Sequence, residues 1–171
     1  MAATEPQPPV VVCDAGPLIH LDEIECLPLL SDFPKVLLPQ AVWDEVNKHR
    51  ANALRPTTFQ IQKVEPTQAL PPELEALSRL LALHRGEREA LQIALSQPGC
   101  VVLTDDTAAR LASRNLGLAA HGTIGILVRA IRRKQKTKNE VISLLRSLPA
   151  RSTLHIRPAL LAEIIRDVEQ S

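Results

Sequence analysis

Aspartate follows two short, β-branched apolar runs in this sequence, directly in one case and after a single threonine in the other. Asp14 follows residues 10–13, and Asp105 and Asp106 follow residues 101–103. Such short runs are typical of strands buried within a parallel sheet, and the carboxyl ends of parallel strands meet at one edge. Ligands of α/β sheets bind outside that edge. We therefore expect two distant parts of the chain to place acids at one ligand-binding edge.

Helical patterns alternate with apolar runs along the rest of the chain. Further strands are predicted at 36–38, at 118–120 and at 59–64, where alternating polar residues favour an edge strand. Helices are predicted at 18–30 with a break near Pro28, and at 40–53, 73–83, 87–97, 108–116, 124–134, 137–148 and 158–169. This alternation predicts a three-layer α/β/α sandwich with a mainly parallel sheet of four to five strands.

Composition favours a cytoplasmic protein without a membrane segment. The 171 residues suit one domain, and no apolar run approaches the roughly 20 residues that cross a bilayer. Residues 1–9 carry three prolines and neither the basic nor the apolar region of a signal peptide, so a disordered leader is expected. The cysteines are odd in number and share no CxxC spacing, which favours reduced thiols at Cys13, Cys26 and Cys100.

Acids also lie on the apolar sides of two predicted helices. A helical wheel places Glu45 at the margin of an apolar stripe, where it can face inward, and turns Asp44 away. In the segment 87–97, Glu87 lies within the apolar arc and Glu89 lies at its edge. A charged residue in an apolar arc is an informative exception to the usual pattern.

Carboxylates that converge repel one another unless a cation neutralises them. Because oxygen ligands favour a hard ion, these acids predict a Mg²⁺ or Mn²⁺ site. The five histidines are dispersed without metal-ligand spacing and are expected at the surface or at helix ends. For any single acid, capping of a helix N-terminus is an equal explanation, but independent capping does not account for an inward-facing Glu45.

Charge is distributed unevenly along the chain. Residues 1–106 hold 15 acidic and 8 basic side chains, whereas residues 107–171 hold 4 acidic and 12 basic ones. Such asymmetry is a hint of nucleic-acid contact, although cations near a helix C-terminus also suit the helix dipole. The candidates for contacts with nucleic-acid phosphates are Arg88, Arg110, Arg114, Arg132, Arg133 and Lys134.

Five ordered blocks of the sequence resemble the successive motifs of PIN-domain proteins, and within that family they resemble the VapC-like toxins of bacteria and archaea. The blocks are VVCDAGPLIHL from residue 11, LPQAVWDEV from residue 38, GEREAL from residue 86, LTDD from residue 103 and GTIGIL from residue 122. The resemblance covers roughly residues 10–148. It implies a nuclease domain there, followed by a C-terminal extension at 149–171 with a terminal helix.

The resemblance implies an endoribonuclease that cleaves single-stranded or structured RNA, often a homodimer held inactive by an antitoxin protein. Matched position by position, it assigns the catalytic and metal-binding roles to Asp14, Glu45, Glu89 and Asp106, with Asp105 and Glu87 as secondary candidates. Relatives often carry a hydroxyl residue two positions after the first acid, where this chain has Gly16. No hydroxyl is therefore expected at that position to hydrogen-bond Asp14.

Two other functions fit parts of the pattern. A catalytically inactive PIN-like module would act through protein or RNA contacts, although acids at all four matched positions argue against lost catalysis. A phosphatase or a receiver switch would use Asp14 directly, but such phosphatases need a second Asp where this chain has Gly16, and a receiver needs a lysine that we do not locate. The sequence therefore predicts a Mg²⁺- or Mn²⁺-dependent endoribonuclease, the toxin of a toxin–antitoxin pair.

Overall fold

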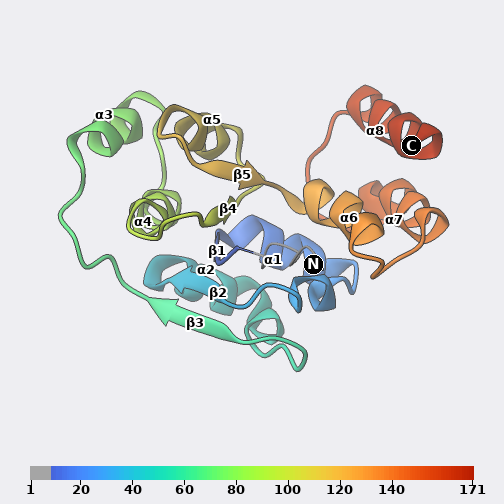
Figure 1. Ribbon diagram of the computed structural model, residues 1–171, viewed down its shortest axis with the longest axis horizontal. Helices are drawn as coiled ribbons and strands as arrows, with labels where there is room; N and C mark the ends of the chain where they lie inside the picture. The colour runs from blue at the N-terminus through green and yellow to red at the C-terminus, as the bar shows by residue number, and fades with distance from the viewer. Residues whose placement is uncertain (1–8) are drawn as a thin grey trace, which may run out of the picture.

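The computed structural model describes residues 9–171 and contains one five-stranded sheet (Figure 1). All neighbouring strands are parallel, and their order is β3-β2-β1-β4-β5. Their bounds are β1 (Val11–Cys13), β2 (Val36–Pro39), β3 (Ile61–Val64), β4 (Val101–Leu103) and β5 (Ala119–His121). The predicted parallel sheet is confirmed, and β3 is an edge strand as its alternating pattern indicates. Except for Pro9, the expected disordered leader lies outside the described residues.

Eight α-helices and two 3₁₀ helices connect and follow the strands within residues 9–171. They are α1 (Ala15–Glu23), η1 (Leu27–Leu30), α2 (Gln40–Arg50), η2 (Ala51–Leu54), α3 (Pro72–Leu80), α4 (Arg85–Leu95), α5 (Thr107–Asn115), α6 (Thr123–Arg132), α7 (Lys138–Arg151) and α8 (Pro158–Gln170). The helix expected over 18–30 is two elements, because Glu25 adopts a left-handed φ of 59° between them. None of these helices is both long and apolar enough to cross a membrane.

Helices cover both faces of the sheet because alternate strand residues point to opposite sides. Val11 and Cys13 of β1 lie in one core with apolar residues of α1, α6, α7 and α8. Val12 lies in a second core with residues of α3, α4 and α5. The strands β1 and β2 are buried along their whole length, which explains their uninterrupted apolar sequence. The predicted three-layer α/β/α architecture is confirmed.

The last helix contributes to the main core of the domain. Leu161 and Val168 of α8 are buried in the same cluster as Val11 of β1. Helix α7 continues past residue 148 to Arg151, and α8 packs on α7 at one side of the molecule (Figure 1). The segment 149–171, expected as an extension, therefore includes side chains on which the core depends.

The direction of strand addition reverses between β1 and β4. In chain order, β2 and β3 are added on one side of β1, and β4 and β5 are then added on the other side. In open parallel sheets the loops that leave two such strands separate, and their divergence opens a crevice at the carboxyl edge. The residues that follow β1 and β4, Asp14 and Thr104–Asp106, lie at this carboxyl edge.

The contribution of α8 to the core can be measured with two neighbouring leucines. Leu161→Ala is expected to lower the free energy of unfolding by about 2 to 4 kcal/mol, because it leaves a cavity in a packed core. Leu160→Ala, at a side chain 39% exposed, is expected to cost less than about 1 kcal/mol. Urea unfolding of both variants provides the comparison. Equal, small effects would show that α8 does not stabilise the domain.

Candidate functional site

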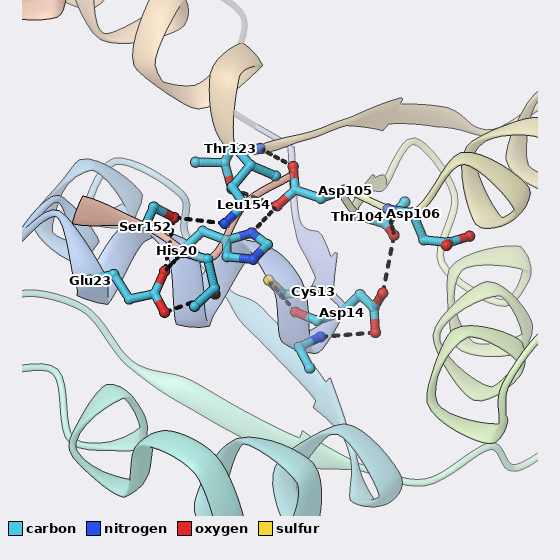
Figure 2. A network of polar contacts seen from close by, with 12 residues as sticks. Cys13, Asp14, His20, Glu23, Thr104, Asp105, Asp106, Thr123, Ser152 and Leu154 are labelled. Carbon is cyan, nitrogen blue, oxygen red and sulfur yellow. Dashed lines mark hydrogen bonds and ion pairs between the residues drawn. The ribbon is translucent and has the colours of Figure 1, made fainter. Parts of the chain in front are cut away.

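Asp14 is held at the centre of the carboxyl edge by its neighbours in β1 and β4. The register pairs Cys13 with Leu103, and the Asp14 N–H donates to the Leu103 carbonyl at 2.8 Å. The buried Thr104 hydroxyl donates to Asp14 Oδ2 at 3.0 Å, and the Ala15 N–H donates to Oδ1 at 2.8 Å (Figure 2). Thr104 thus supplies a hydroxyl contact to Asp14 that Gly16 cannot supply.

Burial is the main cause of the raised pKa of the Asp14 carboxyl group. Its side chain is 8% exposed, and burial raises its pKa to about 6, against the opposing effect of the Ala15 N–H. The negative charges of Glu87 and Glu45 raise the pKa further, and the Thr104 hydroxyl lowers it. Both hydrogen-bond donors to this carboxylate are neutral groups. At neutral pH, these neutral donors therefore stabilise the negative charge of Asp14 less than a cation would.

Glu87 is the second buried acid at this edge. It lies in the first turn of α4, where its Oε2 accepts from the His84 N–H at 2.8 Å. Burial raises its pKa, and the charges of Asp106 and Glu45 raise it further, while the His84 N–H lowers it. Glu87 lines one hollow with Glu45, and the residue before it, Gly86, lies against Asp14.

Gly86 allows the first turn of α4 to approach Asp14. A Cβ added at Gly86 would lie 3.1 Å from Val42 Cγ2 of α2 and 3.9 Å from Asp14 Oδ1. A side chain at this position would press against α2, so glycine permits the close packing of α2 and α4. This packing sets the adjacent Glu87 beside the end of β1.

Glu89 takes part in a different set of contacts. Its Oε1 accepts from Arg85 Nε at 2.7 Å, and its Oε2 accepts from the Ala41 N–H at 3.3 Å. It borders a separate hollow with Gln40 and Arg88, whereas Glu87 borders a hollow with Glu45. Of the two acids in α4, the structure therefore brings Glu87 to the Asp14 group and ties Glu89 to Arg85.

Glu45 and Asp106 complete the group from the solvent side. Both side chains are exposed, and Asp106 caps α5 by accepting from the Ala109 N–H at 2.8 Å through Oδ1. Glu45 borders the same hollow as Glu87, and the charges of Asp106 and Glu45 both contribute to the raised pKa of Glu87. As the side chains stand, no three acidic, histidine or cysteine groups within residues 9–171 are arranged to hold one metal ion.

Asp105 joins three elements and is turned away from the Asp14 group (Figure 2). Its Oδ1 accepts from the Thr123 N–H at 2.7 Å, and its Oδ2 lies 2.6 Å from the Thr123 hydroxyl and 2.7 Å from His20 Nδ1. The carboxylate thus connects the end of β4 to the start of α6 and to α1. Sequence reasoning assigned no role to His20, because 85 positions separate it from Asp105 and no spacing pattern marks such a pair.

Comparison with known families identifies the domain. A family model described as a PIN domain matches residues 10–170. The chain belongs to the PIN-domain family. PIN domains are generally nucleases and typically use divalent metal ions. The match extends through α8, which agrees with the burial of Leu161 and Val168. A search of curated proteins finds no match to this chain.

The predicted RNA-contacting cations of this PIN domain lie in different places. Arg110 borders a cavity beside Asp105, and Arg88 borders the hollow that contains Glu89. Arg114 is exposed in the last turn of α5. Of these three residues, Arg110 is the one that borders the cavity next to the sheet edge that carries the acids.

The other three cations lie at the far end of α6. That helix begins at the carboxyl edge of the sheet and ends beside the loop that precedes β2. There Arg129 and Arg133 both pair with Asp32, at 2.7 and 2.8 Å. Arg132 and Lys134 are exposed next to them. This basic group is therefore separated from Asp14 by the length of the helix.

The raised pKa of Asp14 predicts that its charge destabilises the metal-free domain. A group with a pKa of about 6 when folded and near 3.8 when unfolded binds its proton more tightly in the fold. Ionisation of Asp14 therefore lowers the free energy of unfolding. This loss begins at about pH 4, increases as the pH rises and reaches its full value above about pH 6. Asp14→Asn is expected to raise the free energy of unfolding by about 1 to 3 kcal/mol near pH 7.5.

Urea unfolding in the presence of EDTA measures this effect. The stabilisation by Asp14→Asn should shrink toward zero near pH 4, where the folded wild-type carboxyl group is itself protonated. A variant that is less stable than wild type at both pH values would contradict a destabilising buried charge at Asp14.

The contacts of Asp105 predict unequal effects at two glycines near the start of α6. A Cβ at Gly122 would lie 2.5 Å from Asp105 Oδ1 and 3.3 Å from the Thr104 carbonyl oxygen. Because Thr123 fixes that carboxylate, Gly122→Ala is expected to cost about 1 to 3 kcal/mol. Gly125→Ala meets its first atom, His121 Cβ, at 3.4 Å and should gain up to about 1 kcal/mol from helix propensity. Thermal unfolding of the pair distinguishes them, and a neutral Gly122→Ala would refute the rigidity of the Asp105 junction.

Proposed function

We propose that this PIN domain is a Mg²⁺- or Mn²⁺-dependent endoribonuclease that hydrolyses RNA phosphodiester bonds. The observation that carries the proposal is the buried Asp14 carboxylate beside Glu87 at the carboxyl edge, with a pKa raised to about 6. Two buried, mutually repelling acids favour the binding of a cation between them. Carboxylate oxygens suit hard divalent ions, and PIN domains typically use such ions.

Asp14 and Glu87 would hold the ion, and Glu45 and Asp106 would complete its ligand set from the solvent side. The exposed Glu45 side chain can turn in solvent, whereas Asp106 would first have to release the Ala109 N–H from which its Oδ1 accepts. Asp14 is oriented by Thr104 and Ala15 in advance, so little conformational entropy remains to be lost there on binding. The proposal ranks Glu87 above Glu89, because Glu89 is engaged by Arg85.

When bound, the divalent ion would neutralise charge on a phosphodiester and make an attacking water more acidic. The protein supplies the geometry. The Thr104 hydroxyl and the Ala15 N–H hold both Asp14 oxygens, and the Asp105 junction fixes the loop after β4 that carries Asp106. No side-chain nucleophile is required for direct hydrolysis of this kind.

Two glutamates of α4 provide a matched test of the proposed ligand set. Glu87→Gln and Asp14→Asn are expected to reduce Mn²⁺-dependent cleavage of a single-stranded RNA at least about 100-fold, because each removes a proposed ligand. Glu89→Gln, which removes the same charge on the same helix, should retain more than about a tenth of the activity. The reverse order would assign the third ligand to Glu89.

Thermal unfolding with added Mn²⁺ gives a second measurement that does not depend on cleavage. A ligand that binds the folded state raises the unfolding temperature, so wild type should gain stability and Asp14→Asn should gain less. The absence of any gain in wild type would favour the catalytically inactive binding module.

The resemblance to VapC-like toxins extends the proposal to biological role. We infer a cytoplasmic toxin that forms homodimers, cleaves single-stranded or structured RNA and is inhibited by an antitoxin. Growth arrest on expression of the wild type, but not of Asp14→Asn, is the expected result for a toxin of this kind.

A further inference from the structure

A cavity of about 520 Å³ lies beside Asp105 at the acidic edge of the sheet. It is bounded by the end of β5, the start of α6, the segment 154–157 and the start of α8. Apolar side chains of α6 and α8, Ile124, Leu160 and Ile164, line one part of it. Arginine and histidine side chains line another part. This volume and mixed lining are typical of small-molecule sites.

The walls of the cavity are held in place before any ligand binds. Ser152 Oγ and the Thr153 N–H both donate to Glu23 Oε2 of α1, at 2.8 and 2.7 Å (Figure 2). The Leu154 N–H donates to Ser152 Oγ at 3.1 Å, which positions the segment that borders the cavity. Gly125, on the other wall, contributes no side chain to the space. A preformed site of this kind loses little entropy on binding.

The charge around the cavity suits a phosphate. Arg110 and Arg157 border it, and His121 lies close to several cations: its pKa is lowered by burial and then by the charges of Arg110, Arg132 and Arg129. Asp105 is the one acid in its described lining, and its oxygens accept from Thr123 and lie against His20. The cavity therefore offers cations beside a site whose acids repel RNA.

We propose that this cavity binds one nucleotide of a single-stranded RNA, with the base against Ile124, Leu160 and Ile164 and its phosphate on Arg110 and Arg157. The inference rests on the proposed nuclease function and names how that site captures its substrate. Arginine is suited to phosphate because its planar donor groups match phosphate oxygens. The base would be held by apolar contact, because aromatic residues other than histidine are absent from the described lining.

Binding of AMP in EDTA, followed by calorimetry or NMR, tests the cavity without cleavage. Arg157→Gln should weaken AMP binding about tenfold by removing a charged hydrogen-bond donor. Arg166→Gln, the same change at an exposed arginine of α8 outside the cavity lining, should leave it unaltered. Leu160→Ser should weaken AMP and adenosine alike and leave inorganic phosphate unaffected. Both Arg157 and Arg166 are exposed, so neither change threatens folding.

The outcomes separate the cavity from the nuclease. Two results together would support the nucleotide site. AMP binds with the stated order of variants, and Arg157→Gln raises the KM for a short RNA about fivefold or more at unchanged kcat. Failure of AMP to bind, or equal affinity for AMP and phosphate, would overturn the nucleotide site even if wild type cleaves RNA. RNA cleavage with an unaltered KM in Arg157→Gln and Leu160→Ser would also overturn it. AMP binding without RNA cleavage would support the site and reject the proposed function.

Discussion

The pairing of β1 with β4 is the contact on which the rest of the site depends. Cys13 lies opposite Leu103, so the first residues beyond both strands, Asp14 and Thr104, emerge side by side. The hydrogen bond from the Thr104 hydroxyl to Asp14 follows directly from that register. Because the order of strands reverses at this pair, the same contact also places Asp14 at the edge where open parallel sheets bind their ligands.

The acids at this edge serve different physical roles although they are neighbours in space. Asp105 is satisfied by Thr123 and His20 and secures the loop after β4 to α6 and α1. Asp14 receives only neutral donors and is destabilised by burial. The buried charge of Asp14 thus lowers the stability of the domain, whereas the contacts of Asp105 make this edge rigid. Such a division is expected at a ligand-binding site. The cavity bordered by Arg110 and Arg157 adds cations next to the same edge.

Sequence patterns predicted the layers, the parallel sheet and the elements that carry the acids, because short apolar runs and helical stripes are local signals. The family match ranked Glu89 above Glu87, two positions before it on the same helix, whereas our proposal ranks Glu87 first. That choice depends on how α4 meets α2, where Gly86 allows close contact and Arg85 turns to Glu89. Nor did any local pattern indicate that Arg133, one of the predicted RNA-contacting residues, pairs with Asp32 at the far end of α6.

The sequence by itself determined the α/β class, the order of its elements and the presence of acids after β1 and β4, because each of these follows from residues adjacent in the chain. The tertiary structure decided which side chains each acid contacts. It paired His20 with Asp105 across 85 positions and brought Thr104 to Asp14 across 90. Such contacts depend on strand register and helix packing, and no local pattern of residue types encodes the distance between two remote side chains.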